Sequence, residues 1–234
     1  MEILVATAKI PKFGLSESGD SLEVIERPRG GLTAVMADGQ GHGRPAKRVS
    51  KLVVDKAVSL VADGTRDGAV ARAVHDFLFA IREGKVSADL TILSVDLRSR
   101  SFVVSRNSNA PVLVRKPDGV LVLDERVEPI GVHEMMKPSM TEWALEPGTV
   151  VVALTDGVIE AGRRHGQGLT AGDLLEVSKP YDVYQVDRIA EGVLGRALDA
   201  DAGQPHDDMT VMVFGISARR PEPTIRRLSI SFPV

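Results

Sequence analysis

Hydrophobic positions in the first forty residues follow the short-period pattern of β-strands. Apolar runs occupy residues 2–10 (EILVATAKI), 21–28 (SLEVIERP) and 32–38 (LTAVMAD). The turn-forming residues RPRGG separate the second run from the third, so this pair predicts a β-hairpin.

Helical spacing then replaces the strand pattern in two consecutive blocks. Residues 45–62 and 69–82 place their apolar side chains three and four positions apart, which predicts two helices. Pro45 suits the first turn of the former helix, where its missing N–H is tolerated, and Gly84 ends the latter. A further amphipathic helix is predicted over residues 182–200.

Between these helical blocks the strand period returns. Residues 89–125 predict a meander of four short strands, with turns at RSR, NSNAP and KPDG. Single strands are predicted at 140–145, 149–158 and 208–216. Antiparallel strand runs with helices in separate blocks predict an α+β fold built in layers, rather than a parallel βαβ array.

Length and composition are those of an ordinary globular domain. The chain has 234 residues, of which 43% are hydrophobic and 26% charged, and such a length is enough for one well-formed core. We expect one domain over residues 1–217, followed by a basic C-terminal tail or edge strand over residues 218–234. The sequence assigns no oligomeric state.

Charge and residue usage exclude several classes of function. A formal net charge of −3 argues against a nucleic-acid partner. Because the chain has no cysteine, a disulfide, a thiolate metal site and a cysteine nucleophile are all excluded, and any metal must be held by oxygen or imidazole. No apolar run reaches about 18 residues, and the amino terminus does not fit a signal peptide. We therefore expect a cytoplasmic protein that does not enter the membrane.

Four aspartates share the same position relative to apolar strands. Asp38 and Asp156 each follow a strand, whereas Asp20 and Asp207 each precede one. Strand ends from several segments can meet at one rim of a pair of sheets, and carboxylates gathered there repel each other unless a cation neutralises them. The pattern therefore favours a site for a hard divalent metal.

The residues after two of these aspartates are glycines. Gly39 and Gly157 are expected to let the backbone turn sharply and to offer carbonyl oxygens, which magnesium and manganese accept as ligands. Each DG pair alone is more often a plain turn. The GQGHG segment at 39–43 resembles a nucleotide-binding loop, but it lacks the G-x-G-x-x-G spacing and a Walker lysine.

Taken together, four segments resemble a known family. The series SGDS (18–21), VMADGQGHG (35–43), LTDGVIE (154–160) and DDMTVMVF (207–214) is similar to the metal-dependent protein serine/threonine phosphatases of the PPM (type 2C) family, and within it to the bacterial SpoIIE-like and RsbX/RsbU-like branch. The matching segments span residues 19–214. Where that branch usually has AGH before the proline of a strand pair, this chain has Asn107, Ser108 and Asn109.

The resemblance implies an αββα sandwich of four layers, two antiparallel sheets flanked by helices, with two Mn²⁺ or Mg²⁺ ions at one edge. Carried over to this chain, Asp38 would bridge both metals and Gly39 would lend its carbonyl. Asp156 and Asp207 would hold the second metal, and Asp20 would act from the outer edge of the cluster.

Asp208, second in its acidic pair, would lie beside the ligands without binding metal itself. Metals in such a site lower the pKa of a bridging water, so that hydroxide attacks phosphorus directly and no protein nucleophile is needed. Larger members of the family carry a histidine two residues after the bridging aspartate, where this chain has Gln40. His42 is a candidate general acid in its place, although a structural or solvated role fits it equally well.

The resemblance also implies a substrate. RsbX-type enzymes of similarly minimal build act on phosphoserine or phosphothreonine in small regulatory proteins of bacterial partner-switching pathways, which control sigma factors and stress responses. Two alternatives use the same fold: a noncatalytic binding module that only recognises a partner, and a phosphatase of small phosphate esters. Retention of all four aspartates argues against the binding module, because recognition does not need carboxylates that repel each other.

Overall fold

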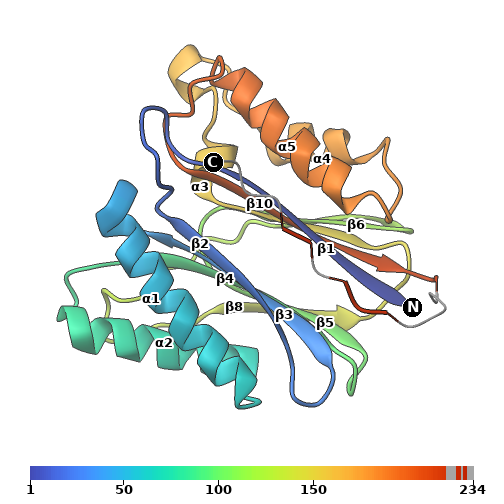
Figure 1. The fold of residues 1–234 in the computed structure, drawn as a ribbon, viewed down its shortest axis with the longest axis horizontal. Coiled ribbons are helices and arrows are strands. Elements are labelled where there is room, and N and C mark those ends of the chain that lie inside the picture. Colours follow the sequence, from blue (N-terminus) through green and yellow to red (C-terminus); the bar gives the residue numbers. More distant parts are fainter. Residues whose placement is uncertain (220–224, 228, 231–234) are drawn as a thin grey trace.

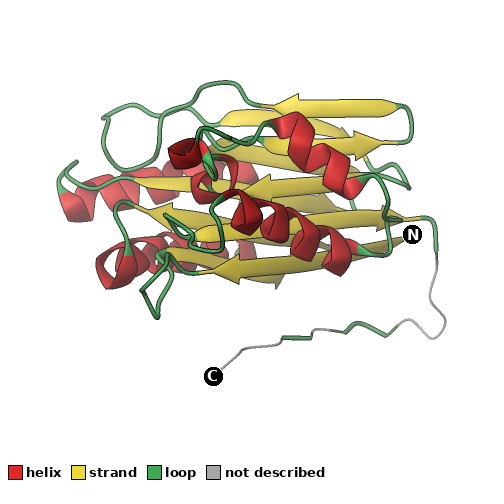
Figure 2. Ribbon diagram, turned by 90° about the horizontal axis from the view of Figure 1, so that it is seen from above, coloured by secondary structure: helices red, strands yellow, loops and turns green. Residues whose placement is uncertain are grey.

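Two five-stranded antiparallel sheets lie face to face, and helices cover the outer face of each (Figures 1 and 2). The computed structural model describes residues 1–219, 225–227, 229 and 230. The α+β class and the αββα layering expected from the sequence are confirmed.

Sheet 1 has the order β2-β3-β4-β5-β8. Its strands are β2 (Asp20–Glu26), β3 (Gly31–Gly39), β4 (Ala88–Asp96), β5 (Ser101–Asn107) and β8 (Ser139–Ala144). The outer face of this sheet is covered by α1 (Gly43–Ala62) and α2 (Asp67–Arg82). Strands β2 and β3 form the hairpin that the sequence predicts.

Sheet 2 has the order β1-β10-β9-β6-β7. Its strands are β1 (Glu2–Ile10), β6 (Val112–Lys116), β7 (Gly119–Leu123), β9 (Val150–Leu154) and β10 (Met209–Ser217). The helical segments on this side are α3 (Asp156–Ile159), a 3-10 turn (Arg163–His165), α4 (Ala171–Ser178) and α5 (Val186–Ala200). The first strand of the chain thus pairs with the last one described.

The meander predicted over residues 89–125 is wrong as a continuous unit. Strands β4 and β5 pair in sheet 1, whereas β6 and β7 pair in sheet 2, so the chain crosses between sheets at the NSNAP turn. A period of two shows that strands exist, but it does not show which sheet each one joins. The helix predicted over 182–200 begins later than expected, at Val186.

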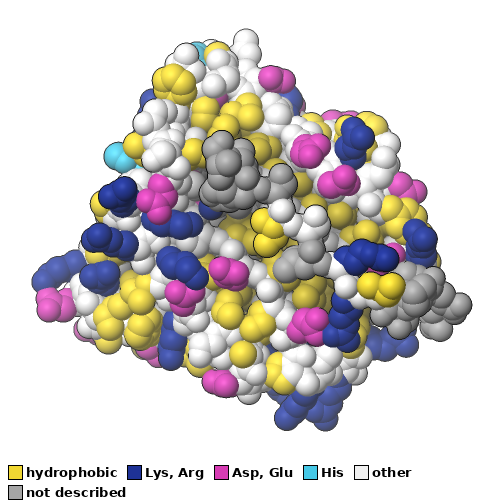
Figure 3. Space-filling model, viewed as in Figure 1, with side chains coloured by type: hydrophobic (Ala, Val, Ile, Leu, Met, Phe, Trp, Pro, Cys, Tyr) yellow, Lys and Arg dark blue, Asp and Glu magenta, His cyan; other side chains and the backbone are white. Residues whose placement is uncertain are grey.

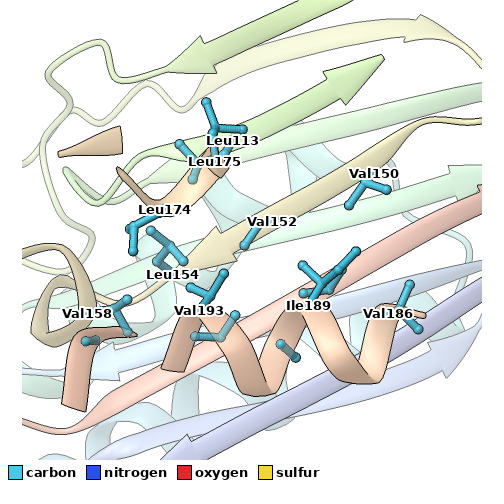
Figure 4. Close-up of a cluster of buried hydrophobic side chains, with 14 of the residues drawn as sticks. Leu113, Val150, Val152, Leu154, Val158, Leu174, Leu175, Val186, Ile189 and Val193 are labelled. Carbon is cyan, nitrogen blue, oxygen red and sulfur yellow. The ribbon is translucent and has the colours of Figure 1, made fainter. Parts of the chain in front are cut away.

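Alternate side chains of the central strands pack into different layers of the core. In β3, Ala34 and Met36 point into the space between the sheets, whereas Val35 and Ala37 pack under α1. Figure 4 shows the cluster between sheet 2 and its own helices, where Val152 of β9 lies near Ile189 and Val193 of α5. Burial on both faces explains why the central strands have continuous apolar runs instead of alternation.

Basic and acidic side chains are interspersed on the face drawn in Figure 3. Within the described part of the chain, no helix combines the length and the apolar character needed to cross a bilayer. The predicted tail or edge strand over residues 218–234 falls partly outside the described residues. Those of its residues that are described form no strand, and Arg226 among them contacts Glu26 of β2.

A buried ion pair joins sheet 1 to the start of α2. Arg27 donates to Asp67 across 2.8 Å, and the two side chains are only 9% and 8% exposed. Asp67 also accepts a hydrogen bond of 2.7 Å from Ser94 of β4, and Arg27 donates to Thr33 of β3. The network therefore fixes one end of the outer helix layer on its sheet.

Replacing Asp67 by alanine should lower the free energy of unfolding by about 3–5 kcal/mol, because it leaves the Arg27 guanidinium buried without its partner. The matched control is Asp55→Ala, which removes the exposed pair between Asp55 and Lys51 and should cost no more than about 0.5 kcal/mol. Urea unfolding of both variants measures the difference. Equal losses would show that the buried pair has no special role.

Candidate active site

Three aspartates lie in a row across the end of sheet 1. Asp20 on β2 is the register partner of Asp38 on β3, and Asp38 is the partner of Asp89 on β4. Side chains directly opposite each other in antiparallel strands lie on the same face. Since Asp38 follows Met36 by two positions, all three carboxylates are on the face turned toward sheet 2.

Sheet 2 contributes polar side chains to the same rim, from the residues just after β9 and just before β10. Thr155 and Asp156 follow β9, and Asp207 precedes β10. The Oδ2 atom of the fully buried Asp20 accepts hydrogen bonds from Thr155 Oγ1 at 3.1 Å and from Thr210 Oγ1 at 2.5 Å. One carboxylate thereby joins the two sheets at the rim where the acidic groups gather.

The second acidic residue of the DD pair has a structural task. Asp208 is buried and accepts backbone hydrogen bonds from Lys12 at 3.0 Å and from Gly19 at 2.8 Å. It therefore holds the loop that leads into Asp20. Asp207 lies beside it, half-buried, with its Oδ1 accepting the Asp208 N–H at 2.9 Å.

The electrostatics of the cluster are those of carboxylates that repel one another. Burial, followed by the charges of Asp20, Asp156 and Asp89, raises the pKa of Asp38 far above its usual range. Burial and then Asp207 also raise the pKa of Asp156. Without a cation, the fold therefore favours a protonated form of the cluster.

Donor chemistry in the site suits a hard cation. Oδ1 of Asp20 and Oδ1 of Asp156 are buried and have no hydrogen-bond partner among the described residues. In the present conformation no three acidic or histidine side chains of the described chain stand close enough together to enclose a metal ion. Binding would thus require the carboxylates to draw closer, which a cation favours by cancelling their repulsion.

Positive charge is available at one side of the cluster. The half-buried Lys47 of α1 donates to the main-chain carbonyl of Asp20 at 2.6 Å, and Lys9 of β1 donates to the same oxygen at 3.2 Å. Burial, and then the nearby Lys9, lowers the pKa of Lys47. Both cations contact the backbone of Asp20 and leave its carboxylate to the threonines.

The glycines beside the aspartates serve close packing and not a sharp turn. Gly39 is the last residue of β3, and a Cβ on it would lie 2.1 Å from the carbonyl oxygen of Ala46 in α1. A Cβ on Gly157 would lie 2.1 Å from the carbonyl oxygen of Asp208. Neither glycine has a positive φ, so the sequence-based explanation of their role is wrong in this respect.

The structure brings Asp20, Asp38, Asp156 and Asp207 to one rim, and Asp208 behind them. Their roles as metal ligands stay predictions, as does that of the Gly39 carbonyl. His42 occupies the N-cap position of α1, but its exposed side chain makes no capping hydrogen bond, and no other hydrogen bond or ion pair of this side chain occurs within the described residues. Its role as a general acid likewise stays a prediction.

Sequence reasoning missed three groups at this rim. Asp89 begins an apolar strand just as Asp20 does, so the signal for it was present in the SADLTIL segment. Thr155 and Thr210 lie next to or near the predicted aspartates but carry no signal of their own. Only the docking of the two sheets shows that both hydroxyls meet Asp20.

The family match places the chain among PP2C-type phosphatase domains, and its fold agrees with this class. The chain belongs to the SpoIIE family, because the model of Stage II sporulation protein E matches residues 28–217. This confirms the resemblance to the bacterial SpoIIE, RsbX and RsbU branch. None of the curated proteins compared with the chain matches it.

Solved structures show the same fold at low sequence identity. The SpoIIE phosphatase domain of Bacillus subtilis, solved with a fragment of its regulatory domain, is 22% identical with a TM-score of 0.81, and the match covers 92% of this chain and 64% of that one. RsbX in complex with magnesium is 18% identical with a TM-score of 0.71, covering 92% and 96%. A serine/threonine phosphatase of S. agalactiae is 12% identical with a TM-score of 0.72, covering 92% and 100%.

The acidic rim should make the metal-free protein less stable as the pH rises. Burial, with a contribution from neighbouring carboxylates, raises the pKa of Asp20 and of Asp89 from 3.8 to about 6. Groups with a raised pKa in the folded state stabilise the fold fully below their unfolded pKa, and this contribution is lost as the pH rises through the folded pKa. The loss is on the order of 3 kcal/mol for each carboxyl.

Urea unfolding in EDTA at a series of pH values between about 4 and 7 measures this dependence. Asp20→Asn should flatten it, since asparagine can still accept from both threonines but does not ionise. A pH dependence that is identical in the wild type and the variant would contradict the assignment.

Gly39→Ala should lower the free energy of unfolding by about 1–3 kcal/mol or more, because its Cβ would overlap the Ala46 carbonyl. Gly195→Ala is the matched control. A Cβ at that position of α5 meets nothing within 4 Å, so alanine should stabilise the helix by up to about 1 kcal/mol. Thermal melting distinguishes the two signs, and a neutral Gly39→Ala would show that α1 can move away from β3.

Proposed function

We propose that this domain is a metal-dependent phosphoprotein phosphatase that hydrolyses phosphoserine or phosphothreonine on a regulatory protein. The observation that supports it most directly is the set of carboxylates from both sheets at one rim, two of which have buried oxygens without partners among the described residues. Such an arrangement destabilises a protein that does not bind a cation. We include residues 1–217 in this one domain.

Asp20, Asp38, Asp156 and Asp207, together with the Gly39 carbonyl, would hold two Mn²⁺ or Mg²⁺ ions. Ions held there would supply Lewis-acid chemistry, activating water and neutralising phosphoryl oxygens. The chain contributes the rest. Thr155 and Thr210 orient the Asp20 carboxylate, and the packing of Gly39 against α1 fixes the backbone next to Asp38.

Structural neighbours support the finer parts of the proposal. RsbX was solved in complex with magnesium, which agrees with a hard divalent cation. Other neighbours belong to the bacterial stressosome and to the RsbU and RsbW domains of a Mycobacterium tuberculosis protein. These are the grounds for proposing a protein substrate in a partner-switching pathway.

Turnover of p-nitrophenyl phosphate and of a phosphoserine peptide, each with Mn²⁺, Mg²⁺ or EDTA, tests the proposal. Both substrates should be hydrolysed only with metal. Asp38→Asn and Asp156→Asn should each lower kcat more than about 100-fold, since even outer partners of metal ligands are worth about 10- to 100-fold. The control is Asp118→Asn, in the exposed turn between β6 and β7, which should leave the rate unchanged.

Several outcomes would count against this function. Undiminished turnover in EDTA or in Asp38→Asn would exclude the metal mechanism. No turnover with any metal would favour a noncatalytic binding module. Hydrolysis of small esters without hydrolysis of phosphopeptides would favour a small-molecule phosphatase.

A further inference from the structure

Asp89 is an acidic residue of the rim that the family motifs do not include. It lies on β4 directly opposite Asp38, on the face turned toward sheet 2. The charge of Asp156 acts on it from the other sheet. A carboxylate in this place adds to a cluster that already repels itself, so its presence calls for an explanation.

Ser108 fixes the orientation of Asp89. The Ser108 hydroxyl is buried and donates to Asp89 Oδ2 at 2.8 Å. The hydroxyl oxygen of Ser108 in turn accepts the N–H of Ala110 at 3.2 Å. Because a hydroxyl has only one hydrogen to donate, this arrangement leaves Oδ1 of Asp89 free of the serine.

The turn that carries Ser108 is itself anchored. The side chain of Arg106 is fully buried and donates to the Ser108 carbonyl and to the Glu125 carbonyl. Asn107 donates to the Glu128 carbonyl at 3.0 Å, and Asn109 accepts the N–H of Val127 at 3.1 Å. These contacts hold residues 107–109 against 125–128, so the position of Ser108 is determined on both sides.

A small cavity lies between the three carboxylates of Asp38, Asp89 and Asp156. Its volume is about 10 Å³, and its polar lining consists of Asp38, Asp89, Thr91, Ser108, Thr155 and Asp156. This is close to the space needed by one water molecule. Two buried oxygens of the rim, Asp156 Oδ1 in the lining and Asp20 Oδ1 on the fully buried neighbour of Asp38, have no partner among the described residues.

This inference rests on the metal centre of the proposed function. We propose that Asp89, which lies beside Asp38 on the central strand β4, is a further cation ligand, and that Ser108 is its positioning residue. Carboxylate and hydroxyl oxygens are the ligands that a hard divalent cation prefers, although the described carboxylates would have to draw closer around it than they stand now. The NSN sequence at 107–109 then has a function, because its serine aims an acidic ligand at the centre.

A purely structural role for Asp89 makes a different prediction. In that case the residue is a buried acid satisfied by Ser108, and asparagine, which still accepts from the serine, would replace it without any effect on metal binding. Metal affinity therefore separates the two explanations, whereas loss of stability would not.

Isothermal titration with Mn²⁺ of the wild type, Asp89→Asn and Ser108→Ala tests the proposal, with Asp96→Asn at the opposite end of β4 as the matched control. Asp89→Asn should weaken Mn²⁺ binding more than about tenfold, and Ser108→Ala should weaken it about tenfold, because the carboxylate remains but loses its partner. Asp96→Asn should bind as the wild type does. In EDTA, Asp89→Asn should melt at the same temperature as the wild type or higher, since one repelling charge is gone, but it should gain less in melting temperature when Mn²⁺ is added.

Wild-type affinity and stoichiometry in Asp89→Asn would overturn this inference and leave the proposed function intact. If the wild type itself bound no Mn²⁺, the proposed function would fail and the inference with it. Should Asp89→Asn not fold, unchanged Mn²⁺ affinity in Ser108→Ala would overturn the inference, because the orientation of Asp89 toward the centre is argued from its contact with Ser108.

Discussion

Repulsion between carboxylates held in a poorly solvated space is the constraint on which this rim depends. Asp38 has acidic neighbours on both sides in its own sheet and another across the gap. Each ionised group makes ionisation of the next more costly, and burial increases that cost. At the rim where its two sheets meet, the protein therefore holds an arrangement of carboxylates that is unfavourable unless a cation neutralises them.

The surrounding structure is organised to hold these groups in spite of their repulsion. Asp20 is tied to β10 and to the residue that follows β9 through two threonine hydroxyls, and Asp208 holds the loop before Asp20 by accepting from two backbone N–H groups. Gly39 allows α1 to approach so closely that no side chain fits between them. Packing of apolar side chains in three core clusters offsets the unfavourable free energy of the carboxylates gathered at the rim.

Local features were predictable from the sequence, and features that depend on pairing were not. The hairpin of β2 and β3 and the helices α1 and α2 follow from apolar spacing and turn residues. The four aspartates were identified because each lies at the end of an apolar strand. The crossing of the chain between β5 and β6, and the meeting of Asp89 with Asp38, depend on which strands become neighbours and in what register, which periodicity does not determine.

The pairing of β1 with β10 has a consequence for how the chain acquires its shape. Within the described residues, β1 has no other partner strand, so it cannot complete its backbone hydrogen bonds before residues 209–217 are present. Sheet 1, whose strands end at residue 144, can assemble earlier. The two sheets thus differ in how much of the chain they need, since sheet 1 is complete at residue 144 and sheet 2 needs the chain up to residue 217.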